Sequence, residues 1–268
     1  MVVTCSRIFF EPVRRILRKH CLEAGAASGE VEVEFMSYIE NDSYAPTHRR
    51  FPTRTSGKAL WAVLALLIPL AAYGQDAATQ MIEAAKRGDP DGLRSVLGKG
   101  IDVNSKNADG RTALMEAAYW GRVEAAKTLL EKGADVNLKD KDDRTALIDA
   151  AANGHVQVVV ALLEKEVSLN AKTRDGATAL SEAAANNRAE VVKALLGKGA
   201  NVDEKDKEGR TPLALAAYWG HADAAQVLIE KGANVAAKDK YGYSALMYAK
   251  RENHPNVAEL LTKAGAKP

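Results

Sequence analysis

The strongest constraint in this 268-residue chain is an internal repeat with a period of 33 residues. A hydroxyl residue recurs at this spacing, and a leucine follows it two positions later each time. The pairs are Thr112 and Leu114, Thr145 and Leu147, Thr178 and Leu180, Thr211 and Leu213, and Ser244 and Leu246. One period earlier, Thr79, Met81, Gly88 and Leu97 fall into the same register, which predicts six units with a degenerate first one. Because a unit of this length cannot bury its apolar side alone, neighbouring units must stack and share a core.

Residues 109–141 show what one unit contains. A turn at Asp109-Gly110 precedes a helix from about Thr112 to Tyr119, and Gly121 separates it from a second helix that ends near Lys132. The threonine hydroxyl is a natural N-cap, because it can accept a hydrogen bond from a free amide of the first turn. The sequence therefore predicts an all-α repeat solenoid whose helix pairs are joined by short β-hairpin tips.

Three turn positions in each of five units are expected to need a positive φ. Eleven of these fifteen positions are glycine, two are asparagine, one is Asp143 and one is Glu166. Asn and Asp tolerate the left-handed region best after Gly, so only Glu166 breaks the rule. A strained Glu166 would cost about 1 kcal/mol, and Glu166→Gly is expected to recover a similar amount.

The repeated motifs resemble those of the ankyrin-repeat family over about residues 76–268. The motifs that carry the resemblance are Asp109-Gly110-Arg111-Thr112-Ala113-Leu114, Glu208-Gly209-Arg210-Thr211-Pro212-Leu213, Gly154-His155, Gly220-His221, Gly133-Ala134-Asp135-Val136-Asn137 and Gly199-Ala200-Asn201-Val202. The sequence departs from the family pattern where Met115, Ile148, Ser181, Ala214 and Met247 replace the usual histidine. The resemblance implies L-shaped units that bind other proteins through hairpin tips and a concave first-helix face, without catalysis.

An apolar run precedes the repeats. Residues 59–72 are almost entirely apolar and follow Arg49, Arg50, Arg54 and Lys58. As a helix the run would span about 21 Å, short of the roughly 30 Å hydrocarbon core, and Ala72-x-Gly74 fits a small-x-small cleavage site. Residues 59–74 are thus interpreted as the end of a secretory signal peptide or, if residues 59–73 stay uncleaved, as a signal-anchor.

The division of the chain follows from these features. Residues 1–58 are expected to be a poorly ordered extension, which is too long for a normal signal n-region, so translation could instead start at Met36. Residues 75–108 would form the degenerate N-terminal capping repeat. Residues 109–268 would hold five repeats, the last of them a C-terminal cap.

Composition and motifs exclude several classes of function. The formal net charge is only +2, and acidic residues interleave the basic ones at the repeat tips, so no nucleic-acid partner is expected. Cys5 and Cys21 lie upstream of residue 75, and no P-loop, nucleophile elbow or dinucleotide motif is present, so we expect neither an enzyme nor a cofactor. His155, His221 and His254 occupy equivalent positions and thus lie at least one repeat spacing, about 10 Å, apart, which is too far to share a metal, and they are expected to bond at helix starts.

Candidate binding residues come from aromatic and charged positions. The aromatic candidates are Tyr119, Trp120, Tyr218, Trp219, Tyr241 and Tyr243, and the charged candidates are Arg111, Arg144, Asp149 and Glu182. The arginines are expected in a hairpin-tip row. The carboxylates belong to a row with Glu116 that is either simply solvated or a site for a basic partner segment. Exposure is expected for the four tyrosines, whereas Trp120 and Trp219 could equally pack against the adjoining repeat.

These observations predict a non-catalytic protein-interaction module, monomeric and of an exported, bacterial type. It would act in the periplasm or outside the cell and bind a protein whose identity the sequence does not reveal. The alternatives are an adaptor anchored in the inner membrane by residues 59–73 and a secreted effector that binds a host protein.

Overall fold

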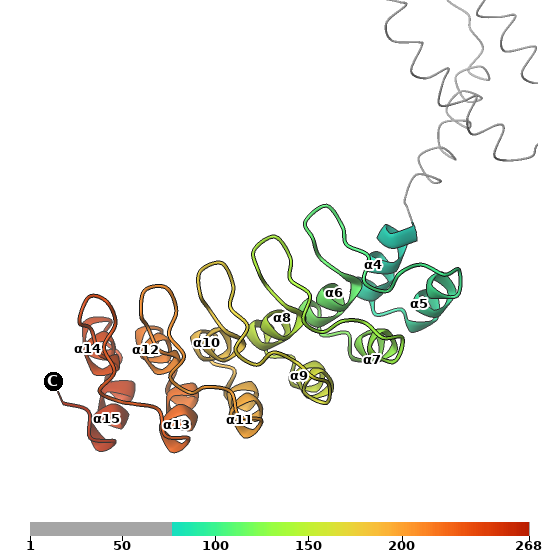
Figure 1. Cartoon of the computed structure of the whole chain (residues 1–268). Coiled ribbons are helices and arrows are strands. Elements are labelled where there is room, and N and C mark those ends of the chain that lie inside the picture. The colour runs from blue at the N-terminus through green and yellow to red at the C-terminus, as the bar shows by residue number, and fades with distance from the viewer. Residues whose placement is uncertain (1–76, 268) are drawn as a thin grey trace, which may run out of the picture. The chain divides into compact units, whose positions relative to one another are not determined.

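Residues 77–267 are the part of the chain that the structure, a computed structural model, describes, and they form twelve α-helices in six pairs (Figure 1). The first helices are α4 (Ala77–Arg87), α6 (Ala113–Tyr119), α8 (Ala146–Asn153), α10 (Ala179–Ala185), α12 (Pro212–Tyr218) and α14 (Ala245–Arg251). The second helices are α5 (Pro90–Leu97), α7 (Val123–Glu131), α9 (Val156–Leu163), α11 (Ala189–Gly197), α13 (Ala222–Glu230) and α15 (Pro255–Lys263). Each kind of helix forms one row, and loops project beyond the first-helix row (Figure 1). The predicted all-α repeat stack is confirmed.

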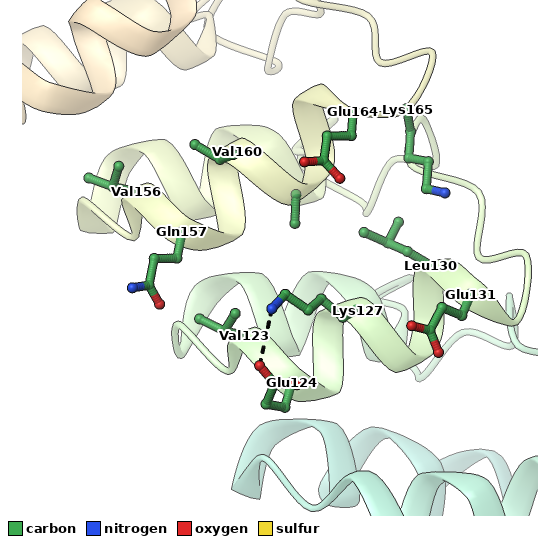
Figure 2. A pocket seen from close by; sticks show the side chains of 11 residues that line it. Val123, Glu124, Lys127, Leu130, Glu131, Val156, Gln157, Val160, Glu164 and Lys165 are labelled. Atoms are coloured by element: carbon green, nitrogen blue, oxygen red, sulfur yellow. Dashed lines mark hydrogen bonds and ion pairs between the residues drawn. The ribbon is translucent and has the colours of Figure 1, made fainter.

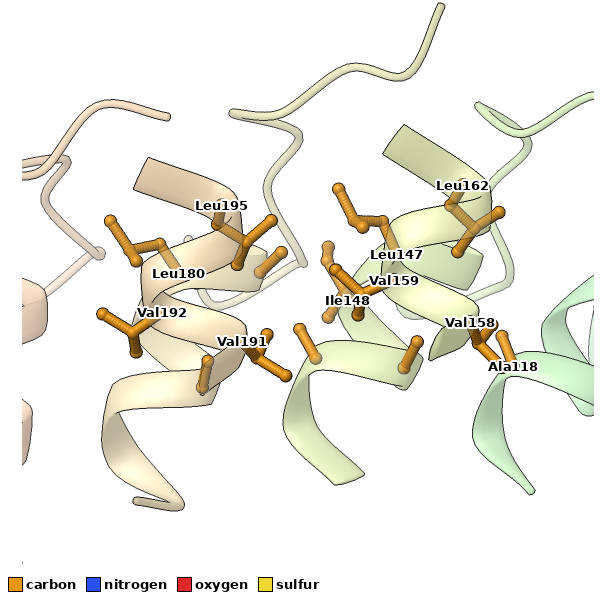
Figure 3. Packing of buried hydrophobic residues seen from close by; sticks show 14 of the residues in the cluster. Ala118, Leu147, Ile148, Val158, Val159, Leu162, Leu180, Val191, Val192 and Leu195 are labelled. Atoms are coloured by element: carbon orange, nitrogen blue, oxygen red, sulfur yellow. The ribbon is translucent and has the colours of Figure 1, made fainter. Parts of the chain in front are cut away.

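The repeating leucines and alanines form one core that runs through the stack. Leu147 of α8 and Leu162 of α9 are 1% and 0% exposed, and their equivalents in the neighbouring repeats, Leu180 and Leu195, are buried to the same degree (Figure 3). The paired alanines of the first helices are also fully buried, which lets neighbouring first helices approach closely. Burying each leucine stabilises the fold by about 1.5–3 kcal/mol, so stacking supplies the core that one unit lacks.

The recurring hydroxyl residues cap the first helices, as the sequence predicts. Thr145 has extended backbone angles, and its Oγ1 accepts from the Ile148 amide at 3.4 Å. The same bond is made at 3.2–3.4 Å by Thr112, Thr178, Thr211 and Ser244. Each cap satisfies an amide that would otherwise lack a partner at the helix start.

Fourteen of the fifteen expected turn positions have a positive φ, including Asp143, Asn187 and Asn253. The exception is Glu166, for which the prediction of a left-handed conformation is wrong. After α7, α11, α13 and α15 the chain closes the second helix with a bond such as that from the Ala134 amide to the Leu129 carbonyl at 3.0 Å. After α9, the Val167 amide instead bonds to the Lys165 carbonyl at 2.8 Å. Without a glycine, the chain leaves this helix by a different path, and Glu166 carries no strain that Gly would relieve.

The loops between the units are turns, and the predicted β-hairpin tips are not seen as strands within residues 77–267. Only two isolated antiparallel bridges occur there, Lys106 with Thr112 and Lys238 with Ser244. Each loop instead bonds to the next one, as the Lys141 amide does to the Asp109 carbonyl at 3.1 Å and the Lys240 amide to the Glu208 carbonyl at 3.0 Å. One backbone–backbone bond of this kind joins each pair of successive loops, without a ladder of paired residues.

The residue that precedes each second helix connects two repeats. The Nε2 atom of His155 lies 3.0 Å from the Tyr119 carbonyl, and the equivalent bonds of His221 and His254 reach Ala185 and Tyr218 at 3.1 and 3.0 Å. The expected hydrogen bonds at the helix starts are thus made to the preceding repeat. Gly121 allows this contact, because a Cβ there would lie 2.4 Å from His155 Nδ1, and its φ of 65° also favours glycine.

The N-terminal extension and the apolar run at 59–72 lie outside the described residues. Between residues 77 and 267, no helix is long and apolar enough to cross a membrane.

Candidate protein-interaction site

A cluster of ionised side chains lies at the base of the loops, on the first-helix face. Its centre is Asp149 of α8, which is 0% exposed. Arg111 Nη2 donates to one carboxylate oxygen at 2.9 Å, and Arg144 Nε donates to the other at 2.7 Å. A buried carboxylate is stable only when such partners compensate its desolvation, so Asp149 joins two successive loops to one helix.

Further carboxylates complete the cluster. Arg111 also bonds to Glu116 at 2.6 Å and to Asp140 at 3.0 Å, and Arg144 lies 3.6 Å from Glu182. Burial by itself would lower the pKa of Arg111, but the neighbouring Asp149 and Glu116 outweigh it and raise that pKa. The pKa of Arg144 is raised in the same way, chiefly by Asp149. Both arginines therefore stay charged and fixed.

The cluster corrects two expectations about charged candidates. Asp149 does not belong to a solvated acidic row, because it is fully buried between two arginines. The side chains of Arg111 and Arg144 are only 17% and 26% exposed and bond within the cluster, so they offer little surface as the partner contacts expected from the sequence. Glu182 keeps partial access to solvent and remains a candidate contact residue.

An exposed aromatic pair lies at one side of the cluster, at the end of α6. Tyr119 and Trp120 are 42% and 44% exposed and meet edge to face at 5.3 Å between ring centroids. Trp120 Nε1 donates to Glu116 at 3.2 Å, and the Arg111 guanidinium lies 5.7 Å from the Tyr119 ring. The cluster therefore holds both rings in place while it leaves their outer surfaces free.

A second aromatic pair lies at the end of α12, three repeats further on. Trp219 is exposed and contacts Tyr218 edge to face at 4.9 Å, the same arrangement as in the first pair. Tyr218 is more enclosed, because the Tyr248 ring of α14 packs against it at 5.6 Å. The exposure expected for Tyr218 is thus only partial.

Tyr243 and Tyr248 extend the second pair into a larger group. Their rings stack at 5.4 Å, and the Arg251 guanidinium lies 4.9 Å from the Tyr243 ring. Burial, followed by the hydrogen bond to Asp239, raises the pKa of Tyr248 to about 12. Tyr243 is half-buried in this group, against the expectation of exposure, whereas Tyr241 is exposed on its loop and donates to Glu208 at 2.7 Å.

Small and polar residues lie between the two aromatic pairs. The equivalent positions in the two middle repeats are Ala152 and Asn153, and Ala185 and Asn186. Asn153 and Asn186 donate to carbonyls of their own helices, Asp149 at 3.0 Å and Glu182 at 2.9 Å. We call these four residues the polar gap. Each of them is smaller than the aromatic residue at the equivalent position of the repeats on either side.

Within residues 77–267, no group of three or more His, Cys, Asp and Glu side chains is placed to hold a metal ion. Every buried side-chain nitrogen and oxygen in that part of the chain has a hydrogen-bond partner.

The structure also shows contributors that the sequence analysis did not single out. Arg251 packs on three tyrosine rings, and Val160 of α9 is exposed beside a groove on the opposite, second-helix face. Aligning the repeats could have identified Val160, because its equivalents Lys127, Lys193 and Gln226 are polar. No comparable pattern marks Arg251.

Comparisons with known proteins agree with this architecture. The family described as ankyrin repeats (3 copies) matches at residues 57–140, 81–173, 135–206 and 180–268. The human ASB11 ankyrin repeat domain is similar at 30% identity and a TM-score of 0.65, over 70% of this chain and 84% of that one. An ankyrin repeat domain from Acinetobacter baumannii AYE is similar at 31% identity and a TM-score of 0.64, over 70% of this chain and 98% of that one. The ankyrin repeat protein EF0377 is similar at 28% identity and a TM-score of 0.65, over 69% of this chain and 98% of that one.

The chain belongs to the ankyrin-repeat family. No curated protein matches it. Ankyrin repeats are protein–protein interaction modules, and their fold is typically a non-catalytic binding scaffold.

Proposed function

We propose that this protein binds its partner across the first-helix face, with the two aromatic pairs as anchors and the polar gap as the floor between them. The observation that carries this proposal is the recurrence of one arrangement, an edge-to-face Tyr–Trp pair with an exposed Trp, at both ends of the gap. Exposed aromatic rings on a rigid support are the usual centres of binding energy in protein interfaces.

The spacing of the anchors defines the partner segment. Trp120 and Trp219 lie three repeats apart, which is about 30 Å at roughly 10 Å per repeat. A helix of about twenty residues or an extended segment of about nine would reach both. Glu182, whose side chain is partly exposed at the edge of the gap, favours a basic residue near the middle of that segment.

Two variants test this surface once affinity capture with the full chain has identified a partner. Replacing Trp120 and Trp219 together by Ala should weaken binding by 2 kcal/mol or more, a typical value for interface hot spots, when titration calorimetry measures it. The unfolding midpoint should barely change, because both rings are exposed. The matched control is Gln226→Lys on the second-helix face, which should leave the affinity unchanged. Equal affinity of the double variant and the natural chain would show that the partner docks elsewhere.

We also propose that the protein is exported and acts as a monomer in the periplasm or outside the cell. The support is the apolar run at 59–72, with basic residues before it and a small-x-small site after it. An inner-membrane adaptor and a secreted effector are the alternatives. Fractionation of cells that express a tagged chain separates them, because soluble periplasm, membrane and medium are exclusive outcomes. Intact-mass measurement shows in addition whether the apolar run has been cleaved. Recovery in the cytoplasm at full mass would overturn the proposal.

A further inference from the structure

The second-helix face carries a groove that the proposed function does not use. It lies between α7 and α9 and has a volume of about 620 Å³. Figure 2 shows Val123 and Leu130 on α7 and Val156 and Val160 on α9 among the side chains that line it. The Glu124–Lys127 ion pair, at 3.2 Å, lies on the α7 side.

Val160 departs from the repeat at this groove. It is 45% exposed, although it occupies a position where every other described repeat from α7 to α15 has an exposed polar residue. Those residues are Lys127, Lys193, Gln226 and Glu259. Because an exposed valine contributes little to the core of its own chain, its apolar surface is available to a binding partner.

The charges at the groove are unevenly placed. Glu131 and Glu164 are exposed at equivalent positions at the ends of α7 and α9, and neither has an ion-pair partner among the described residues. The C-termini of two neighbouring helices add partial negative charge at the same end. Lys165 is the single unpaired basic residue among those that line the groove, so this end has a negative balance.

We propose that the groove between α7 and α9 is a second binding site, for a partner segment that places an apolar side chain against Val156 and Val160 and an arginine or lysine at Glu131 and Glu164. Charge complementarity selects this occupant over a second copy docked groove to groove, because that copy would bring the same unpaired carboxylates. The site is independent of the first-helix face and places its occupant on the other side of the stack.

A peptide probe tests the proposal on the full chain. The probe is a fluorescein-labelled eight-residue peptide with two adjacent leucines followed by two arginines, and fluorescence anisotropy follows the titration. Binding should saturate and weaken as salt is raised, because the paired charges are exposed. A peptide with glutamates in place of the arginines should bind at least about tenfold more weakly.

Variants place the binding in the groove. Val160→Lys, which copies Lys127 and Lys193, should weaken binding of the arginine peptide at least about tenfold. Glu131→Gln with Glu164→Gln should weaken it about fivefold and flatten the salt dependence. The matched control Gln226→Lys, at the same position of α13, should leave binding unchanged, and circular dichroism checks that all variants are folded.

Three outcomes would overturn the proposal. They are no saturable binding of the arginine peptide, equal binding by Val160→Lys and the natural chain, and a concentration-dependent dimer in sedimentation that Val160→Lys abolishes. The last result would assign the groove to a second copy. None of them bears on the first-helix face, which the Trp120 and Trp219 variants test separately.

Discussion

The repeat of α8 and α9 and the repeat of α12 and α13 lie two periods apart, and they share a core but differ at both surfaces. Leu147 and Leu213 are 1% and 0% exposed at equivalent positions. On the first-helix face, however, the buried Asp149 corresponds to Leu215, and the polar gap corresponds to the Tyr218–Trp219 pair. The second helices differ as well, since α13 ends in a glycine turn at Gly232 and α9 does not. Stacking therefore requires the same apolar residues at the core positions of both repeats, whereas their surface positions can carry different residues.

The largest expected effect tests the shared core. Leu147→Ala and Leu213→Ala should each lower the free energy of unfolding by about 2–5 kcal/mol, because each leaves a cavity among buried neighbours. Urea unfolding measures both, and Lys141→Ala on an exposed loop should stay within about 0.5 kcal/mol. Similar midpoint shifts for Lys141→Ala and the leucine variants would contradict a common core.

The next effect concerns the first-helix face. Asp149→Asn should destabilise the protein by about 1–3 kcal/mol, because two half-buried arginines lose their shared carboxylate. Glu182→Gln, on the neighbouring repeat with a partly exposed side chain, is the matched control and should cost less than about 1 kcal/mol. If the two costs are equal, the cluster is not centred on Asp149.

A smaller effect compares the ends of α9 and α13. Gly232→Ala should cost about 1 kcal/mol, because its φ of 87° strains any residue with a Cβ and the space around it is otherwise open. Glu166→Gly should destabilise by about 0.4–1 kcal/mol, because it adds unfolded-state entropy and relieves no strain. This reverses the sign expected from the sequence. Stabilisation by Glu166→Gly would show that a left-handed residue follows α9 after all.

The smallest effect is a pH dependence at the start of α13. Burial lowers the pKa of His221 below its ordinary value of 6.5. The unfolded chain therefore binds this proton more readily, so stability should fall as the pH drops from 6.5 through the lowered pKa. Urea midpoints at pH 7.5 and pH 5 measure the loss, and His221→Gln should reduce the difference between them. An unchanged difference would assign the pH dependence to other groups.

Much of the fold could be predicted, because the repeat imposes one local rule at each of its positions. Thr145 caps because a hydroxyl precedes a helix, and Asn187 takes a positive φ because asparagine tolerates it. The end of α9 could not be predicted in this way, because Glu166 offers no residue-specific reason for one turn over another.

The candidate site was less predictable, since it depends on where long side chains reach. Arg111 donates to Asp149, which lies 38 residues further along the chain, and this bond accompanies full burial of the carboxylate. From the repeat period alone, Asp149 would be placed in a row that faces solvent. Tyr218 and Tyr243 are partly enclosed for the same reason, because both contact Tyr248 of α14. The exposure of an aromatic residue depends on its neighbours in space. Its place in the first-helix or second-helix row, by contrast, follows from the 33-residue period of the sequence alone.

The backbone bonds between neighbouring loops and the histidine bonds at the helix starts all join one repeat to a carbonyl of the preceding repeat, and this affects how such a chain can grow. His155 and His254 each bond to a carbonyl of the preceding repeat. The loop amides likewise donate to carbonyls of the preceding loop. A duplicated unit of 33 residues would restore every donor and acceptor on both sides of the insertion. An insertion of another length within a helix, or between the two helices of a unit, would move these donors out of register with the preceding repeat. The structure thus tolerates change by whole units, and we expect related chains to differ in the number of repeats more readily than in the length of one.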